Sequence, residues 1–309
     1  MEIFVMGSDQ RIVRCARVSF AKDNQVDKER DIKLIKYLYQ HRHASPFEHV
    51  VIAIRASKQD WLSMLERLES PAIQIYYADG YIWTNLRNYI NAMELFPKEV
   101  KPLLKDRLPT TIAVVEGQEP EDYSLDESYV KELRETSSGW IGLVDKLELG
   151  TCMDYYTFVV ECPLFVARQW FRHRFGSYNE VSRRYVSYEP DFYIPAYLRK
   201  QAQSNKQASI DEPIDEPYNS IFLKKIKWYI EDLKTLYSHM VEKNTAKELA
   251  RGILPQFMKT RFYWTVPRVS LDNFLSLRRH EGAQKEIREF AEEIEELVDY
   301  RGCDKLLRL

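Results

Sequence analysis

The chain has 309 residues, with 45 lysines and arginines against 47 aspartates and glutamates, and 45% of its residues are hydrophobic. That length allows one large domain or two smaller ones with an ample core, and the hydrophobic share excludes an intrinsically disordered protein. The formal net charge of −2 disfavours a broad nucleic-acid-binding surface, so we expect any anion site to be local.

The cysteines and the N-terminus bear on the compartment. No C-x-x-C pair occurs among the four cysteines, so we expect no metal site, and Cys152 and Cys162 should pack as small apolar residues. The first 20 residues contain no apolar signal segment, and no stretch approaches the roughly 20 apolar residues of a membrane span. We therefore expect a cytoplasmic protein that does not bind a membrane.

The first 54 residues predict a mixture of helix and strand. A short apolar run covers residues 3–6, and helical spacing of Ile32, Ile35 and Leu38 predicts a helix over residues 27–43. Ser45-Pro46 ends that helix, and the β-branched run at residues 50–54 predicts a buried strand.

Residues 55–156 differ in character and carry no chemical motif. Their pattern predicts helices over 60–70, 85–96, 128–135 and 141–149, a loop over 108–129, and a hairpin over 73–84 with Asp79-Gly80 as its turn. We interpret this segment as an inserted, mainly helical subdomain. Its stretch YIWTNLRNYI (81–90) is similar to FYWTVPRVSLDNFLSL (262–277), so either a partial internal duplication or an ordinary aromatic hairpin and helix is possible.

The remainder alternates strands with long helices. Strands are predicted over 157–163 and 262–270, a helix from Pro163 to residue 174, and a polar surface loop over 200–217. Further helices are predicted over 218–244, 245–255, 271–279 and 283–302. This mixture favours the α+β class.

Candidate chemistry is concentrated in RHRFGSYNEVSRRY (172–185), which holds one carboxylate among five arginine or histidine side chains. A helix through residue 174 would place Gln169 on the same face as Arg172 and His173. In an extended segment Glu180, Ser182 and Arg184 would point the same way, and together they suit a nucleotide. The alternative is a solvated helix end that is ion-paired to the acidic C-terminal helix.

RHR followed after seven residues by Ser182 resembles the signature of the flavin-dependent thymidylate synthases. Other blocks resemble the family in the same order: RVSF (17–20), HASPFEH (43–49), FVARQWFRHR (165–174), SYNEVSRRY (177–185), FYIP (192–195), ARGILP (250–255), TRFYWT (260–265) and NFLSLR (273–278). The resemblance implies a discontinuous domain of residues 1–54 and 157–309, with the insertion at 55–156. Its fold would be a central, mostly antiparallel sheet flanked by long helices.

The resemblance also implies an activity: synthesis of dTMP from dUMP, with carbon from methylenetetrahydrofolate and hydride from FAD that NADPH reduces. It implies a homotetramer whose subunits share sites, with Arg278 of a neighbouring subunit acting catalytically on the uracil ring. The residues matching dUMP-binding positions are Gln169, Arg172, Glu180, Ser182, Arg183, Arg184, Arg251 and Arg278. Those matching flavin-binding positions are Ser19, His43, Ser45, Glu48, Arg172, His173, Arg174, Phe175, Glu180 and Asn273.

Several residues qualify this picture. Ser182 is assigned to binding, because no nearby His/Asp pattern would activate it as a nucleophile. Arg183 stands where related sequences often have glycine. Pro267 and Val269 stand where relatives often have an asparagine and an arginine that contact the flavin. Either Arg268 substitutes for these contacts, or the departure indicates an inactive or repurposed nucleotide- or flavin-binding relative.

Overall fold

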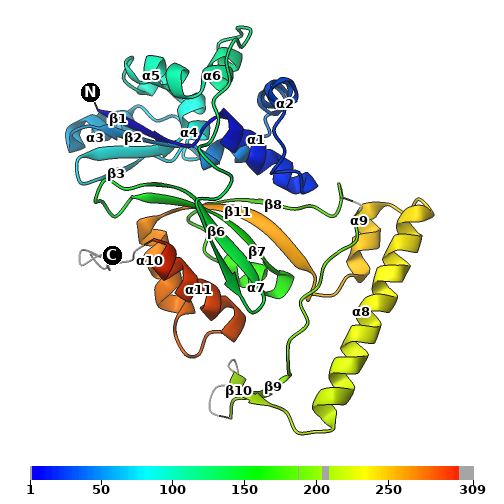
Figure 1. The fold of residues 1–309 in the computed structure, drawn as a ribbon. Helices are drawn as coiled ribbons and strands as arrows, with labels where there is room; N and C mark the ends of the chain where they lie inside the picture. Colours follow the sequence, from blue (N-terminus) through cyan, green and yellow to red (C-terminus); the bar gives the residue numbers. More distant parts are fainter. Residues whose placement is uncertain (1, 187, 204–208, 299–309) are drawn as a thin grey trace.

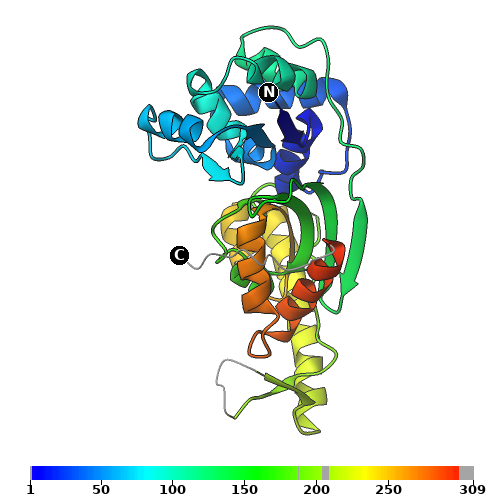
Figure 2. The ribbon, with the colours of Figure 1, turned by 90° about the vertical axis from the view of Figure 1, so that its left-hand side faces the viewer.

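The computed structural model describes residues 2–186, 188–203 and 209–298. Two antiparallel sheets dominate it: β1 to β4 with helices α1 to α6 form one layer, and β5 to β8 with β11 form the sheet below it (Figure 1). Turning the molecule by 90° shows the same two layers, one above the other (Figure 2). The α+β class and the mainly antiparallel sheets are therefore confirmed.

The upper sheet has the strand order β1-β2-β4-β3, with β1 at Ile3–Met6, β2 at Val51–Arg55, β3 at Tyr76–Ala78 and β4 at Tyr81–Asn85. On β2, Ile52 and Ile54 pack against the helices, while Val51 and Ala53 face a second apolar cluster around Trp83. Burial on both faces explains why this strand is a continuous apolar run. The predicted hairpin is confirmed, with its turn residues at positive φ, 48° for Asp79 and 90° for Gly80.

The upper layer's helices are α1 (Asp9–Arg17), α2 (Lys28–Gln40), α3 (Lys58–Glu66), α4 (Leu86–Asn91), α5 (Val100–Arg107) and α6 (Pro109–Val115), with 3₁₀ turns η1 (Val18–Phe20), η2 (Ser45–His49) and η3 (Met93–Leu95). The prediction of a loop over 108–129 is wrong for α6. Pro109 suits a first helical turn, and the buried Asp9 carboxylate accepts hydrogen bonds from the backbone N–H groups of Thr110 and Thr111. Sequence spacing does not reveal a cap from a residue 101 positions away.

The lower sheet has the order β5-β6-β7-β11-β8, with β5 at Glu132–Thr136, β6 at Gly139–Leu147, β7 at Tyr155–Pro163, β8 at Ser177–Glu180 and β11 at Lys259–Pro267. On β7, Phe158 and Val160 face the core formed with α7 (Leu164–Trp170), α10 (Arg268–Arg278) and α11 (Lys285–Leu297). Val159 faces the opposite way, toward a cluster with Cys15 of α1. The cysteine prediction is confirmed: Cys162 lies in the core, and Cys152 packs beside Met153.

The predicted helices over 128–135 and 141–149 are wrong, because these residues form β5 and β6. The register of β6 against β7 shifts between Leu143 and Asp145. Such a bulge breaks the two-residue alternation that would have indicated a strand. β5 is an edge strand with exposed Glu132 and Glu135, so its charges protect the sheet edge and do not mark a helix surface.

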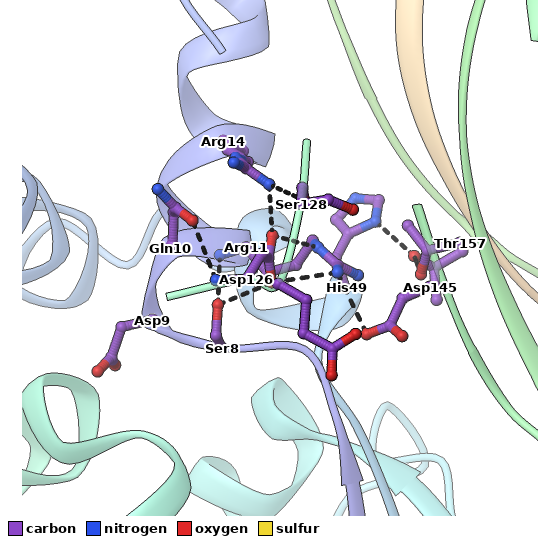
Figure 3. A network of polar contacts seen from close by, with 12 residues as sticks. Ser8, Asp9, Gln10, Arg11, Arg14, His49, Asp126, Ser128, Asp145 and Thr157 are labelled. Carbon is purple, nitrogen blue, oxygen red and sulfur yellow. Dashed lines mark hydrogen bonds and ion pairs between the residues drawn. The ribbon is translucent and has the colours of Figure 1, made fainter. Parts of the chain in front are cut away.

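Residues 55–156 supply strands to both sheets, since β4 pairs with β2 and β6 pairs with β7. A buried ion-pair network fixes the end of this segment to α1 (Figure 3). Asp126 accepts from Arg11 Nε at 3.0 Å and from Arg14 Nη1 at 3.0 Å, and Arg11 also pairs with Asp145 at 3.2 Å. The predicted boundaries at 54 and 157 stay predictions.

The remaining described elements are β9 (Arg199–Gln201), β10 (Ser209–Pro213), α8 (Tyr218–Glu242), α9 (Lys247–Ala250) and η4 (Arg251–Ile253). The predicted surface loop over 200–217 contains the exposed strand β10 and most of its partner β9, and the predicted helix over 218–244 is confirmed as α8. The C-terminal helix is confirmed to Leu297, and residues 299–302 of that prediction lie outside the described residues. In the part of the chain that the structure describes, no helix is long and apolar enough to cross a membrane.

Candidate functional site

The segment after α7 does not continue the helix to Arg174, so that prediction is wrong. The helix ends at Trp170, and the rings of Phe171 and His173 then both pack inward, 5.0 Å from Phe262 and 4.8 Å from Phe274. Residues two apart cannot face the same side of a helix, so the chain leaves the helical path here. Arg172 and Arg174 are consequently exposed on either side of a buried histidine.

His173 joins two other predicted site residues. The Nε of Arg278 donates to His173 Nε2 at 3.0 Å, and its Nη2 donates to the backbone carbonyl of Gln169 at 3.1 Å. Burial, with a smaller contribution from the Arg278 charge, lowers the pKa of His173 from 6.5 to about 4. His173 is therefore neutral at pH 7, and its Nε2 accepts the hydrogen bond that fixes the Arg278 guanidinium.

The alternative of an ion-paired helix end is not supported. Within the described residues, no ion pair joins Arg172 or Arg174 to α11. The acids of α11 pair with Arg134, Arg199, Arg279 and Arg288 instead.

A cavity of about 680 Å³ gathers predicted residues from distant parts of the chain, and we call it the nucleotide pocket after that prediction. Its lining includes seven of them: Ser19, His43, Ser45, Glu180, Ser182, Arg184 and Arg251. The extended-segment argument for three of these was wrong in its geometry. β8 ends at Glu180, and the N–H of Tyr185 donates to the Ser182 carbonyl in a turn, yet Glu180, Ser182 and Arg184 still line one pocket.

Glu180 is the acceptor in this pocket. Thr260 Oγ1 donates to its Oε1 at 2.7 Å, and Ser19 Oγ donates to its backbone carbonyl at 3.1 Å. Burial raises the pKa of Glu180, against the opposing effects of the Thr260 hydrogen bond and of Arg251. The pocket thus holds one partly desolvated carboxyl among cationic donors.

Arg183 has a different environment. Its side chain is buried, with Nη1 donating to the Tyr188 carbonyl at 2.7 Å and the guanidinium 4.4 Å from the Tyr188 ring centre. It does not line the nucleotide pocket, and neither do Gln169, Arg172, His173, Asn273 and Arg278 of the same chain. Asn273 is exposed on α10.

A second cavity, of about 460 Å³, brings the inserted segment to the predicted site, and we call it the insertion pocket. Its lining includes the predicted site residues Glu48, Arg174 and Phe175, and a second group from the inserted segment: Gln74, Tyr76, Thr84, Asn85, Arg87 and Asn88. Sequence reasoning missed the second group. The available signal was the similarity of residues 81–90 to residues 262–277, because both stretches are a strand followed by a helix, β4–α4 and β11–α10.

A hydrogen-bonded chain links the layers beside these pockets. The buried His49 contacts Thr265 Oγ1 through Nδ1 at 2.8 Å and Asn179 Oδ1 through Nε2 at 3.1 Å, and Asn179 Nδ2 donates to Ser45 Oγ at 3.3 Å. Because the amide oxygen of Asn179 only accepts, Nε2 of His49 carries the proton. Burial lowers the pKa of His49 from 6.5 to about 3.

This burial predicts a pH dependence of stability. The unfolded histidine binds a proton below its ordinary pKa of 6.5, whereas the folded one does so only near 3, so the stabilisation present above pH 6.5 is lost as pH falls. At pH 5 relative to pH 7, His49 should cost about 2 kcal/mol of unfolding free energy. Denaturant unfolding of a His49→Gln variant should show a smaller loss of unfolding free energy between pH 7 and pH 5 than the unaltered protein shows. Equal losses in the two proteins would contradict the assignment.

The model of the family described as "Thymidylate synthase complementing protein" matches residues 3–61 and 151–300. The chain belongs to this family. Among its relatives, the flavin-dependent thymidylate synthase of Aquifex aeolicus is 64% identical over 314 residues, covering 99% of this chain and 98% of that protein. The flavin-dependent thymidylate synthase of Thermotoga neapolitana is 28% identical over 93% of this chain and 79% of that protein.

Residues 62–150 lie outside the family match, whereas the Aquifex aeolicus relative aligns with almost the entire chain. Among solved structures, a UMP/dUMP methylase, PolB from Streptomyces cacaoi bound with 5-Br UMP, has a TM-score of 0.41 and 20% identity, covering 96% of this chain and 88% of that one. A likeness this distant carries no argument about the site.

Proposed function

We propose that the protein is a flavin-dependent thymidylate synthase, which converts dUMP to dTMP. The observation that carries this proposal is the nucleotide pocket of a member of the thymidylate synthase complementing protein family. Its lining includes the half-buried carboxyl of Glu180, the Ser182 hydroxyl, and the guanidinium groups of Arg184 and Arg251. The 64% identity to the Aquifex aeolicus enzyme across nearly the whole chain supports the same activity.

The pocket's chemistry suits a nucleoside monophosphate. Arg184 and Arg251 offer the guanidinium forks that match a phosphate, and Glu180 is an acceptor for an N–H group of a base. Ser182 accepts weakly from Arg184 Nε at 3.4 Å, so its hydroxyl proton remains available for donation to the substrate. Arg278 does not line this pocket in its own chain; we propose that it acts in the pocket of a neighbouring subunit.

The residues present also fit a flavin. Ser19, His43 and Ser45 line the nucleotide pocket, while Glu48, Arg174 and Phe175 line the insertion pocket, so polar donors, a cation and an aromatic ring are available for a dinucleotide. When bound, FAD supplies the hydride, and the protein's part is to hold and orient the reacting groups. Methylenetetrahydrofolate as carbon donor and NADPH as reductant complete the proposal. The free cysteines of the protein favour the cytoplasm as its location.

A homotetramer is part of the same proposal. α8 lies apart from the sheets (Figure 1), and large apolar side chains on it are exposed: Ile221, Phe222, Trp228, Tyr229 and Leu236. Exposed apolar surface of this kind marks an interaction site, and a second copy of the chain is the partner we propose. Trp228→Asp should lower the mass measured by light scattering, and an unchanged tetramer would exclude α8 from the interface.

The function is tested with the purified chain supplied with dUMP, methylenetetrahydrofolate, NADPH and FAD. We expect dTMP to form, and to require every component. Binding of FAD and dUMP without dTMP formation would favour the inactive or repurposed relative.

A further inference from the structure

We propose that Asn85 and Arg87 bind the diphosphate of a dinucleotide cofactor in the insertion pocket, at the site where Pro267 and Val269 offer no polar side chain. This inference rests on the proposed function and assigns part of its cofactor binding to the inserted segment. The ligand chemistry, a diphosphate joined to planar rings, is shared by FAD and NADPH.

The pocket has two walls of different origin. Glu48, Arg174 and Pro267 belong to the parts of the chain that the family model matches, and Asn85 and Arg87 belong to residues 62–150, which it does not match. β4 pairs with β2 along its length, so the corner from β4 to α4 is held rigidly beside η2, which carries Glu48. The inserted segment therefore contributes several of the residues that line this cavity.

The charges of the pocket favour an anion. Arg87 Nη1 donates to Glu48 Oε1 in an ion pair, and Arg174 adds a second, exposed guanidinium. Two guanidinium groups against one carboxylate leave a net positive charge, and the arginine fork matches phosphate oxygens. The side chain of Arg87 is 45% exposed and that of Glu48 is 21% exposed, so an entering diphosphate can compete with the carboxylate for the guanidinium.

The rest of the lining suits the ring of a nucleotide. Tyr76 and Phe175 pack with their ring centres 5.0 Å apart, which gives the pocket an aromatic wall. Gly176 lets the lining segment lie close against β11, since a Cβ there would be only 2.9 Å from Trp264 Nε1 and 3.1 Å from the Thr265 carbonyl. Asn85 Oδ1 accepts from the N–H of Asn88 at 2.9 Å, so its amide nitrogen is the donor presented to a ligand.

Asn85 and Arg87 supply polar side chains that Pro267 and Val269 lack. Proline at 267 has no side-chain donor, and Val269 packs in the apolar cluster around Trp83. Asn85 and Arg87 follow Trp83-Thr84 at the strand-to-helix corner of β4 and α4, while Pro267 and Val269 follow Trp264-Thr265 at the equivalent corner of β11 and α10. Both corners contribute to the insertion pocket, so the amide and the guanidinium that Pro267 and Val269 do not offer can come from Asn85 and Arg87.

The test compares Arg87→Met with Arg55→Met in full-length protein. Arg55 is the matched control, because it also forms an ion pair across segments, with Glu2 at 3.2 Å, but does not line the pocket. FAD affinity is measured by fluorescence titration of flavin-free protein, and NADPH affinity by titration of FAD-loaded protein. We expect Arg87→Met to weaken the binding of one dinucleotide roughly ten- to hundredfold and Arg87→Lys to weaken it less. Arg55→Met should leave the affinities for both dinucleotides unchanged.

Weaker FAD binding identifies the flavin as the dinucleotide, and weaker NADPH binding alone identifies the nicotinamide cofactor. The inference is overturned if Arg87→Met and Arg55→Met bind both dinucleotides like the unaltered protein, or if only methylenetetrahydrofolate binding weakens. Failure of the unaltered protein to bind either dinucleotide would instead remove the proposed function itself.

Discussion

Replacing Arg278 with methionine should lower kcat for dTMP formation by about 10²- to 10³-fold, the usual cost of removing one fixed donor from a site where negative charge develops. The structure holds this guanidinium in place through the Gln169 carbonyl and the neutral His173 ring. A donor fixed before the reaction needs no reorganisation as charge develops on the uracil ring. Steady-state kinetics with saturating dUMP measures the effect.

The matched control is Arg279→Met. Arg279 is the neighbouring arginine, and it pairs with Glu295 at 2.9 Å on the exposed surface of the helices. It should keep its activity within a few-fold, since exposed ion pairs contribute little. Equal activities of the Arg278 and Arg279 variants would remove Arg278 from catalysis.

Mixing inactive variants tests whether the site is shared. If Arg278 of one subunit serves the nucleotide pocket of another, co-expressed Arg278→Met and Arg184→Met chains should regain about a quarter of the activity by random assembly. No recovery would place both residues in a site formed by one chain.

Replacing Asp126 with alanine should destabilise the protein by roughly 3–5 kcal/mol, because it leaves two buried guanidinium groups without their shared carboxylate. The side chains of Arg11 and Asp126 are only 1% and 4% exposed, and Ser8 Oγ and Arg14 also donate to the same carboxylate (Figure 3). The loss should release the end of the inserted segment from α1. Denaturant unfolding at pH 7 measures it.

Glu127→Ala is the control for this prediction. Glu127 is the next residue in the chain, 84% exposed and paired with Lys131 at 3.2 Å. Its removal should cost less than about 1 kcal/mol. If Asp126→Ala is no less stable than Glu127→Ala, the network does not anchor the segment.

Local sequence patterns predicted the elements whose signals are local. The positive φ values of Asp79 and Gly80 follow from the two-residue hairpin turn, and α8 follows from its long helical spacing. β6 was missed because its bulge after Leu143 breaks the alternation. The start of α6 was missed because its cap is Asp9, which is close only in the folded chain.

The sequence predicted which residues meet at the candidate site better than it predicted how the chain brings them together. Glu180, Ser182 and Arg184 were grouped by an extended spacing, but a turn brings them to one pocket. His173 is turned into the core by its packing on Phe274, a contact between residues 101 positions apart that no local pattern contains. The contribution of Arg87 depends on the pairing of β4 with β2, which the sequence of either strand alone does not specify.

The most direct test of the proposed activity is a single turnover with the FAD-loaded protein. The bound flavin is reduced by NADPH without oxygen, excess NADPH is removed, and dUMP and methylenetetrahydrofolate are then added together. We predict that the visible absorbance of oxidised flavin returns as about one equivalent of dTMP forms, because the hydride passes to the product. Persistent reduced flavin without dTMP in the presence of both substrates would contradict the assignment as a flavin-dependent thymidylate synthase.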